Sequence, residues 1–311
     1  MLCDDEKFDE VISICAYNNN VGERLDKFVC TQLKNLTRSS IQKLIEHGNI
    51  LVNCNLSSSN YKIKLNDTIL INIPKPVSIT TKPENIPLDI VFEDNDLLVV
   101  NKPKGMVVHP AAGNYTGTLV NALLSHCENS LSGINGELRP GIVHRIDKYT
   151  SGLLIVAKND FSHQNLAFQI KEHSFNREYE AIVYGKFKEL EGIINAPIGR
   201  HSINRKRMAV TNKSSKNAIT HYKVINEYDK FTHLRLKLET GRTHQIRVHM
   251  AYIGHPVAGD TIYGPKNIIK ELNGQCLHAK FIGFVHPRTN NYIEFESELP
   301  KYFKDFLKKL K

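Results

Sequence analysis

Apolar residues in the first quarter of the chain recur at helical spacing and then gather in short strand-like runs. The pattern predicts helices over 25–33 and 41–45 and strands over 50–52 and 67–73. Gly48 stands where a left-handed residue can end the second helix. Residues 11–73 are therefore expected to form a small module of two helices followed by a small sheet.

The stretch PKPVSITTKPENIP, residues 74–87, holds four prolines and few apolar residues, which predicts an extended linker. A second domain is expected over 88–311. Its predicted strands cover 96–101, 106–109, 153–158, 178–185 and 231–239, and a helix is predicted over 243–253 with Thr243 as its N-cap. Strands follow one another without regular helix alternation, so we expect an α+β fold with a mixed, mainly antiparallel sheet.

Composition describes a globular protein that is basic. Of 311 residues, 41% are hydrophobic, and 41 Lys and Arg against 32 Asp and Glu give a formal net charge of +9. No apolar run approaches the roughly 18 residues of a membrane span, and the acidic start MLCDDEKFDE has no signal or transit pattern, so we expect a cytoplasmic location. The six cysteines never form a C-x-x-C pair, which argues against a disulfide framework or a metal knuckle.

The distribution of charge points to nucleic acid. Residues 192–226 contain no acidic residue but seven Lys and Arg, including Arg205 and Arg207. The predicted helices of the module carry further cations, among them Arg38 and Lys43. Such basic stretches suit contacts with phosphate groups, although solvated loops and helix faces often look the same.

Fingerprints for common cofactors and metals are missing from the sequence. Neither G-x-G-x-x-G nor G-x-x-x-x-G-K-[ST] occurs. His126-Cys127-Glu128 matches the H-x-E of zinc deaminases, but no P-C-x-x-C follows. We therefore expect neither a cofactor nor a metal.

One loop carries a candidate catalytic carboxylate. In GIVHRIDKYTSGLLIVAKN, residues 141–159, Asp147 lies in a polar turn before a buried strand, next to Arg145. Taken alone, an aspartate at such a place more often caps a turn than takes part in catalysis. The surrounding motifs decide between the two.

Those motifs resemble the RluA/RluD family of RNA pseudouridine synthases over nearly the whole chain. The matching segments are IPLDIVFEDNDLLVVNKPKGMVVHPAAGN, the HRID loop, REYEA, RMAV followed by ITHY, GRTHQIRVH and LHA. RLDKFVCTQLKNLTRSSIQKLIEHGNILVN resembles an S4-like RNA-binding domain with the α-L fold. The departures are Ile146, where the family usually has Leu, and Ala112, in a stretch usually richer in glycine.

The resemblance implies roles for individual residues. Asp147 would be the catalytic carboxylate, Tyr179 would stack on the target uracil, and Arg247 would pair with Asp147. Arg145 would fill the gap that the extracted nucleotide leaves. The other expected RNA contacts are His144, Arg242, Arg38, Lys43, Arg205 and Arg207.

The resemblance also implies an activity, namely isomerisation of uridines in large-subunit (23S) ribosomal RNA, with the helix 69 stem-loop as the target. The reaction adds and removes nothing, which agrees with an enzyme that needs no cofactor. We expect a monomer whose partner is ribosomal RNA or its precursor particle. Whether Asp147 attacks the sugar or the base stays open.

Two other functions are compatible with some of these residues. An RNA-binding ribosome assembly factor would use the basic module without catalysis. A glycoside hydrolase would need a second carboxylate beside Asp147, for which Glu178 and Asp260 are the candidates.

Overall fold

The computed structural model describes residues 8–33, 38–74, 81–111, 113–128, 130–134, 139–204 and 207–310. The chain divides into two compact units, residues 1–79 and 80–311. Part of the predicted linker, residues 75–80, lies outside the described residues, and 81–87 have no regular secondary structure. Within the described ranges, no helix is long and apolar enough to cross a membrane.

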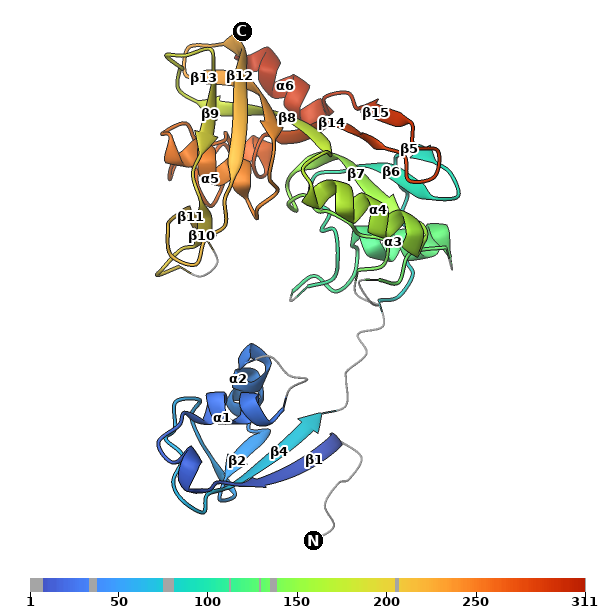
Figure 1. Ribbon diagram of the computed structural model, residues 1–311. Helices are drawn as coiled ribbons and strands as arrows, with labels where there is room; N and C mark the ends of the chain where they lie inside the picture. The colour runs from blue at the N-terminus through green and yellow to red at the C-terminus, as the bar shows by residue number, and fades with distance from the viewer. Residues whose placement is uncertain are drawn as a thin grey trace. The chain divides into compact units, whose positions relative to one another are not determined.

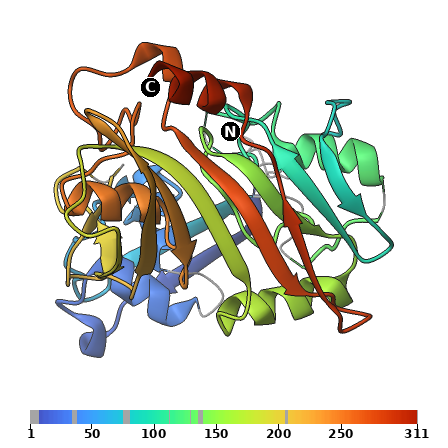
Figure 2. The same ribbon diagram turned by 90° about the horizontal axis from the view of Figure 1, so that it is seen from above.

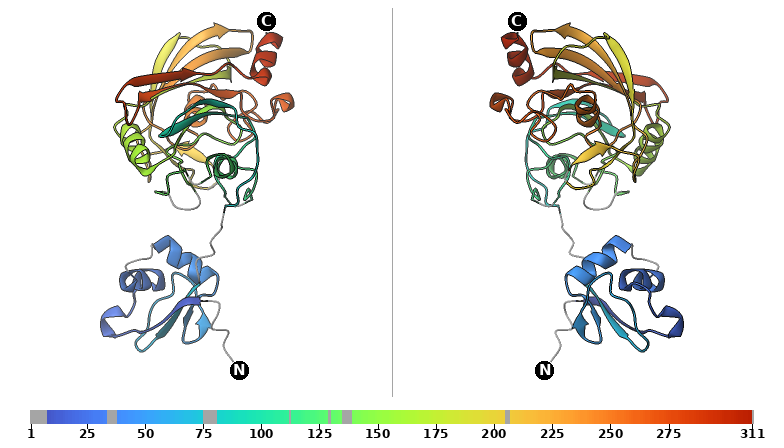
Figure 3. Two further views of the ribbon diagram at one scale, coloured as in Figure 1. Left: turned by 90° about the vertical axis from the view of Figure 1, so that its right-hand side faces the viewer. Right: turned by 90° about the vertical axis from the view of Figure 1, so that its left-hand side faces the viewer.

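The first unit is a four-stranded antiparallel sheet with two helices (Figures 1 and 3). Its elements are β1 (Phe8–Cys15), a short 3₁₀ turn η1 (Asn18–Asn20), α1 (Leu25–Gln32), α2 (Arg38–Glu46), β2 (Ile50–Val52), β3 (Asn55–Leu56) and β4 (Thr68–Pro74), with strand order β1-β4-β2-β3. The two predicted helices and both predicted strands are present. Gly48 has φ +74°, as its place after α2 predicts.

The apolar residues of α1, α2 and the sheet form the core of this unit. Phe28, Ile41 and Ile71 are all at most 1% exposed. Asp26 is also buried, and its carboxylate joins the two helices by accepting hydrogen bonds from Arg24, Arg38 and Gln42. These bonds hold the pKa of Asp26 well below its usual range, Arg24 contributing most.

The second unit is built on a nine-stranded sheet with the order β5-β6-β7-β14-β8-β13-β12-β9, and β15 pairs with β14. Its strands are β5 (Ile90–Glu93), β6 (Leu97–Lys102), β7 (Ser151–Ala157), β8 (Asn176–Tyr184), β9 (Glu191–Asn195), β12 (Ile219–Glu227), β13 (Phe231–Leu238), β14 (Leu277–Val285) and β15 (Tyr292–Glu296). β10 (Ile198–Arg200) and β11 (Met208–Val210) form a separate hairpin. Among the strands described, β7 and β14 make the one parallel pair in this sheet. The predicted α+β fold with a mixed, mainly antiparallel sheet is confirmed.

Helices cover both faces of this sheet. They are α3 (Leu119–Cys127), α4 (Asp160–Lys171), α5 (Gln245–Tyr252) and α6 (Lys301–Lys309), with a short 3₁₀ helix η2 (Lys270–Leu272). Figures 1 and 2 show α3 and α4 near β5–β7, and α5 near β9–β13. Successive apolar residues of β6 and β7 point to opposite faces, so that Leu98 and Leu154 join the core under α3 and α5, while Val99 and Ile155 join that under α4.

One predicted strand is wrong, and one predicted helix is present with a different start and N-cap. Residues 106–109 form no strand, because the carbonyl groups of Val107 and Val108 accept hydrogen bonds from the first residues of α3. The helix predicted from residue 243 begins at Gln245, and its N-cap is His244 with a left-handed φ of +57° rather than Thr243. The Gln245 side chain holds the preceding turn instead, accepting from the Arg242 amide and the Thr240 hydroxyl.

Candidate active site

Asp147 lies in an irregular loop that several backbone contacts hold in place. Lys148, the next residue, accepts hydrogen bonds through its carbonyl from the Gly105 amide at 2.8 Å and from the Lys102 Nζ at 3.3 Å. Lys102 is 1% exposed, and its ammonium also donates to the carbonyls of Pro103 and Met106. Burial lowers the pKa of Lys102 to about 7, against the opposing effect of the Asp147 charge. The NKPKG turn thus anchors the loop.

A glycine fixes where the chain leaves this loop and enters the sheet. Gly152 has φ +114°, and a Cβ at this position would collide with the backbone of Ala279. Here β7 runs parallel to β14, with Gly152 opposite Ala279. Only a residue without a side chain permits this close approach, so Gly152 helps set the distance between the Asp147 loop and the centre of the sheet.

Arg247 on α5 joins two carboxylates. Its Nη1 donates to Asp147 Oδ2 at 2.8 Å, while Nε and Nη2 donate to both oxygens of Asp260 at 2.6 and 2.9 Å. Burial alone would lower the pKa of Arg247, but the hydrogen bonds from its guanidinium to Asp260 and the charge of Asp147 raise it. Burial is the largest single influence on the pKa of Asp260 and would raise it, but the hydrogen bonds and charge of Arg247, together with the backbone amides of Ile262 and Tyr263, hold this pKa below its usual value.

The two carboxylates differ in their access to solvent. The Asp147 side chain is 19% exposed, whereas that of Asp260 is fully buried. Asp147 Oδ1 accepts no hydrogen bond from any residue that the structure describes and lies 3.9 Å from His244 Nε2. Burial lowers the pKa of His244 despite this neighbouring charge, so the ring is neutral near pH 7. Asp147 therefore keeps one oxygen free to meet a reacting group.

Asp147 opens into a cavity of about 460 Å³, within the size range of small-molecule sites. Tyr179 on β8 lines it with Leu238, Ile246 and Leu277, and the ring is largely buried. Burial raises the pKa of Tyr179, so its hydroxyl stays protonated. The cavity has an apolar aromatic wall next to one accessible carboxylate.

Charge in this cavity is strongly unbalanced. Among the described lining residues Asp147 is the only acid, whereas five are Lys or Arg: Arg145, Lys171, Arg177, Arg242 and Arg247. Only Arg247 among the five bonds to that acid. A positive cavity of this kind favours a polyanionic ligand.

The predicted substrate contacts of the second unit lie in different settings. Arg145 is exposed at the cavity, and Arg242 lines it while its Nε donates to the Asn217 carbonyl. His144 also lines the cavity, but its Nε2 accepts a hydrogen bond from the Ile155 amide. Burial lowers the pKa of His144 to about 3, and the Arg177 charge adds to this effect, so the ring is a neutral part of the scaffold.

The other predicted RNA contacts lie away from Asp147 in the sequence. Arg207, beside β11, places its guanidinium 5.3 Å from the centre of the Tyr263 ring, and Arg205 lies outside the described residues. On α2, Lys43 is exposed, whereas Arg38 is bonded to the buried Asp26. Arg38 thus has a structural partner that the charge pattern did not predict.

Three further residues complete the site: Asp260, which the sequence offered only as a second carboxylate for a glycoside hydrolase, and Tyr263 and Lys102, which it did not single out. Asp260 and Tyr263 come from GHPVAGDTIYG, which looked like a structural turn, and Lys102 comes from the NKPKG motif. Tyr263 contacts both neighbours of Asp147: its hydroxyl bonds His244 Nδ1 at 2.9 Å, and its ring lies 5.1 Å from the Arg247 guanidinium.

The geometry does not favour a glycoside hydrolase. Asp260 is fully buried against Arg247, and Glu178 lies with Arg235 in a different surface hollow. Neither can flank a bond held at Asp147, so the two-carboxylate arrangement proposed as an alternative is wrong.

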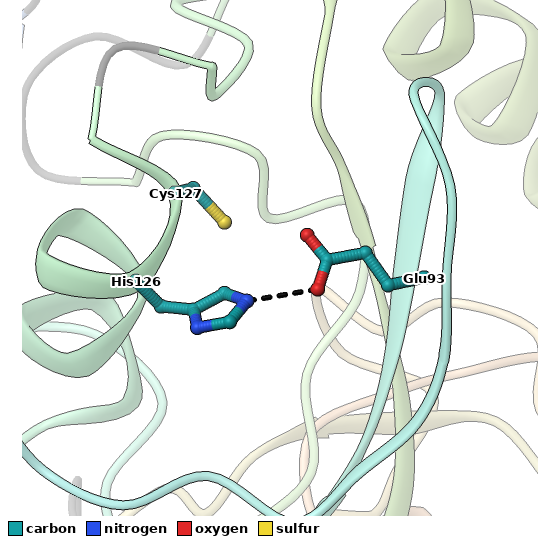
Figure 4. A group of neighbouring side chains, drawn as sticks. All are labelled: Glu93, His126 and Cys127. Atoms are coloured by element: carbon teal, nitrogen blue, oxygen red, sulfur yellow. Dashed lines mark hydrogen bonds and ion pairs between the residues drawn. The ribbon is translucent and has the colours of Figure 1, made fainter.

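Two groups of side chains elsewhere have the spacing of metal ligands. One is Glu93, His126 and Cys127, drawn in Figure 4, where the imidazole Nε2 lies 2.8 Å from Glu93 Oε2. Lys158 pairs with the other oxygen of Glu93, and burial raises the pKa of the Cys127 thiol to about 11. The other group, Asp94, Asp96 and His286, is likewise occupied by an arginine, Arg288. The carboxylates of both groups are paired with basic side chains of the protein.

Comparison with known proteins agrees with this geometry. Residues 96–252 match the RNA pseudouridylate synthase family, and residues 23–69 match the S4 domain. The chain is 49% identical over 300 residues to an uncharacterized RNA pseudouridine synthase of Bacillus subtilis, YlyB, covering 96% of this chain and 98% of the relative. It is 47% identical over 296 residues to ribosomal large subunit pseudouridine synthase D of Zymomonas mobilis, covering 90% and 92%.

A solved structure shares the fold of the second unit. Human RNA pseudouridylate synthase domain containing 1 superposes with a TM-score of 0.56 at 25% identity, covering 76% of this chain and 97% of the human chain. The family match spans both the Asp147 loop and the Arg247 helix. The chain therefore belongs to the RNA pseudouridine synthase family of enzymes and carries an S4 domain in its first unit.

Proposed function

We propose that this enzyme converts uridines of large-subunit ribosomal RNA to pseudouridine, with Asp147 as the catalytic carboxylate. The observation that carries the proposal is the pairing of an accessible aspartate with a buried arginine at the bottom of a positive cavity lined by Tyr179. The similarity to large subunit pseudouridine synthase D supports ribosomal RNA as the substrate class. The helix 69 stem-loop as the target is part of the proposal and follows from the sequence resemblance alone.

The reaction breaks the bond between the anomeric carbon and N1 of uracil, and joins the same carbon to C5. The C5 proton leaves and N1 gains a proton, so atoms and charge balance within the nucleoside. Positive charge develops near the anomeric carbon as the first bond breaks. The Asp147 carboxylate stabilises or traps that charge, and Arg247 keeps the carboxylate oriented.

A uridine inside RNA must leave its stack to reach Asp147. Tyr179 offers the uracil an aromatic face in the cavity, and exposed Arg145 stands at the cavity wall where it can occupy the vacated position. Extraction costs least for unpaired bases, which favours a loop uridine. The S4 domain supplies additional phosphate contacts, for which exposed Lys43 is a candidate.

The test is conversion of 23S ribosomal RNA by purified protein without added cofactor, followed by chemical mapping of pseudouridine at nucleotide resolution. We expect new pseudouridines in the helix 69 loop. If uridines are converted only outside helix 69, the proposed target is wrong but the proposed activity stands. If no uridine is converted in free RNA or in precursor particles, the chain is an assembly factor rather than an active synthase.

A further inference from the structure

A second arginine of the cavity has no counter-charge. Arg177 lies on β8 and is only 7% exposed, yet it lines the cavity. Its guanidinium donates no hydrogen bond to any described residue, and its buried Nε has no partner. An arginine stays charged even when buried, and a buried charge without a partner is strongly unfavourable. The missing partner is expected to come from a ligand.

The chain leaves room for this guanidinium. A Cβ at Gly241 would lie 2.7 Å from Arg177 Nη1, although the backbone conformation of Gly241 does not require glycine. The Phe175 ring supports the guanidinium from another direction, at 6.0 Å. Arg242 directly follows Gly241 in the chain, and its charge adds to burial in lowering the pKa of Arg177. Two like charges are therefore gathered at one wall of the cavity.

We propose that Arg177 and Arg242 bind a phosphodiester group of the RNA backbone next to the target uridine. This subsite rests on the proposed function. Arg177 and Tyr179 are two residues apart on one strand, so their side chains share a face about 7 Å apart. In a nucleotide whose base stacks on Tyr179, only the ribose separates the base from the phosphate. A guanidinium binds a phosphate through paired hydrogen bonds.

The test couples a protein change to a substrate change. A stem-loop RNA is made around a uridine that the wild-type enzyme converts, and each nearby phosphate in turn is replaced by a neutral methylphosphonate. We expect wild-type kcat/KM to fall about 10- to 100-fold at one position next to the uridine. Arg177→Gln should lower kcat/KM on normal RNA by a similar factor. Methylphosphonate at that same position should then lower the kcat/KM of this variant little further. Arg177→Lys, which keeps the charge, retains part of the sensitivity.

Arg235→Gln is the matched control. Arg235 is an exposed arginine on the same sheet, outside the cavity, so its variant keeps the full loss at that phosphate. Gly241→Ala is a second variant, which crowds the Arg177 guanidinium while leaving its charge and should weaken the same coupling. Thermal midpoints of all variants show whether they are folded.

Equal methylphosphonate profiles for the wild type and Arg177→Gln would overturn the subsite. If the wild type converts no uridine, the proposed function fails first, and the same RNAs around the helix 69 loop uridines are then used in binding assays. If methylphosphonate at one position weakens the Kd of the wild type but not that of Arg177→Gln, the phosphate subsite is supported without catalysis. If both proteins lose affinity equally, the subsite is overturned. The dependence on one phosphate position also separates RNA from free inorganic phosphate as the source of the anion.

Discussion

Arg247 Nη1 lies 2.8 Å from Asp147 Oδ2, although the two residues are 100 positions apart in the chain. The rest of the same guanidinium is bonded to Asp260. Because Asp260 is fully buried and Asp147 is partly exposed, Asp260 acts as the permanent partner that orients Arg247 toward the exposed carboxylate. The predicted effects of changing Asp260 and Asp147 follow from this three-residue arrangement.

Asp260→Asn should damage stability and activity together. The change leaves Arg247 buried with only Asp147 as an anionic partner, and breaking a buried ion pair of this kind costs roughly 3–5 kcal/mol of unfolding free energy. Denaturant unfolding measures the loss, and kcat measures the misorientation of Arg247. Asp305→Asn, which removes an exposed pair with Lys301, is the control and should leave the midpoint unchanged. A fully stable and active Asp260→Asn variant contradicts the positioning role.

Tyr179 should act through its ring rather than its hydroxyl. The hydroxyl makes no hydrogen bond with a described residue, so Tyr179→Phe is expected to keep kcat/KM within about tenfold of the wild type. Tyr179→Leu removes the face on which a base can stack, a contribution of about 1–3 kcal/mol, and should lower kcat/KM about 10- to 100-fold. Steady-state conversion of the same RNA by both variants tests this. Equal activity of the Leu and Phe variants would show that stacking is not needed.

His144 should make the second unit sensitive to acid. Burial lowers its pKa to about 3 in the folded protein, whereas an unfolded histidine has a pKa near 6.5. Between these values the unfolded chain binds more protons, so unfolding free energy falls as the pH drops from about 6.5 toward 3. Each such proton contributes up to about 1.4 kcal/mol per pH unit.

His144→Gln keeps an acceptor for the Ile155 amide but does not titrate, so it should reduce that slope. Urea unfolding between pH 5 and pH 7 gives the measurement. His173→Asn, at an exposed position of the same unit, is the control and should keep the wild-type slope. An unchanged slope in His144→Gln would rule out this histidine as a source of the acid sensitivity.

The two basic residues of α2, Arg38 and Lys43, should differ in role: one stabilises the first unit and the other binds RNA. Arg38 bonds to buried Asp26, so Arg38→Ala is expected to lower the thermal midpoint of the first unit. Lys43 is exposed, so Lys43→Ala should leave that midpoint unchanged. If Lys43 contacts a phosphate, the variant also lowers the salt dependence of RNA affinity by about one charge. Filter binding at several salt concentrations tests this, and identical behaviour of the two variants would contradict the division.

The sequence predicted those elements whose hydrophobic periods are regular, and it missed many of the other strands and helices. The strands at β6, β7, β8 and β13 and both helices of the first unit follow directly from that signal. The segment 106–109 has the same apolar character, but its carbonyls accept hydrogen bonds from Leu119 and Val120 at the start of α3 instead of pairing in a sheet. The local sequence pattern cannot predict this difference, because it depends on tertiary contacts.

Residues of the site could be predicted only where they belong to motifs that resemble a known family. Asp147, Tyr179 and Arg247 came from a family resemblance, because no local pattern links residues 100 positions apart. The role of Asp260 as a partner of Arg247 was not predicted, because the sequence offered Asp260 only as a second carboxylate of a hydrolase. Lys102 was missed because it looked like part of a loop. Their importance depends on burial and on partners from distant segments, which only the folded chain brings together.

The central role of Asp147 is tested most directly by Asp147→Asn in a single-turnover assay paired with RNA binding. The variant keeps the shape of the side chain but loses the negative charge that Arg247 orients. We expect Kd for the RNA to stay within a few-fold of the wild type while pseudouridine formation is abolished. Appreciable conversion by Asp147→Asn would contradict the account at its centre.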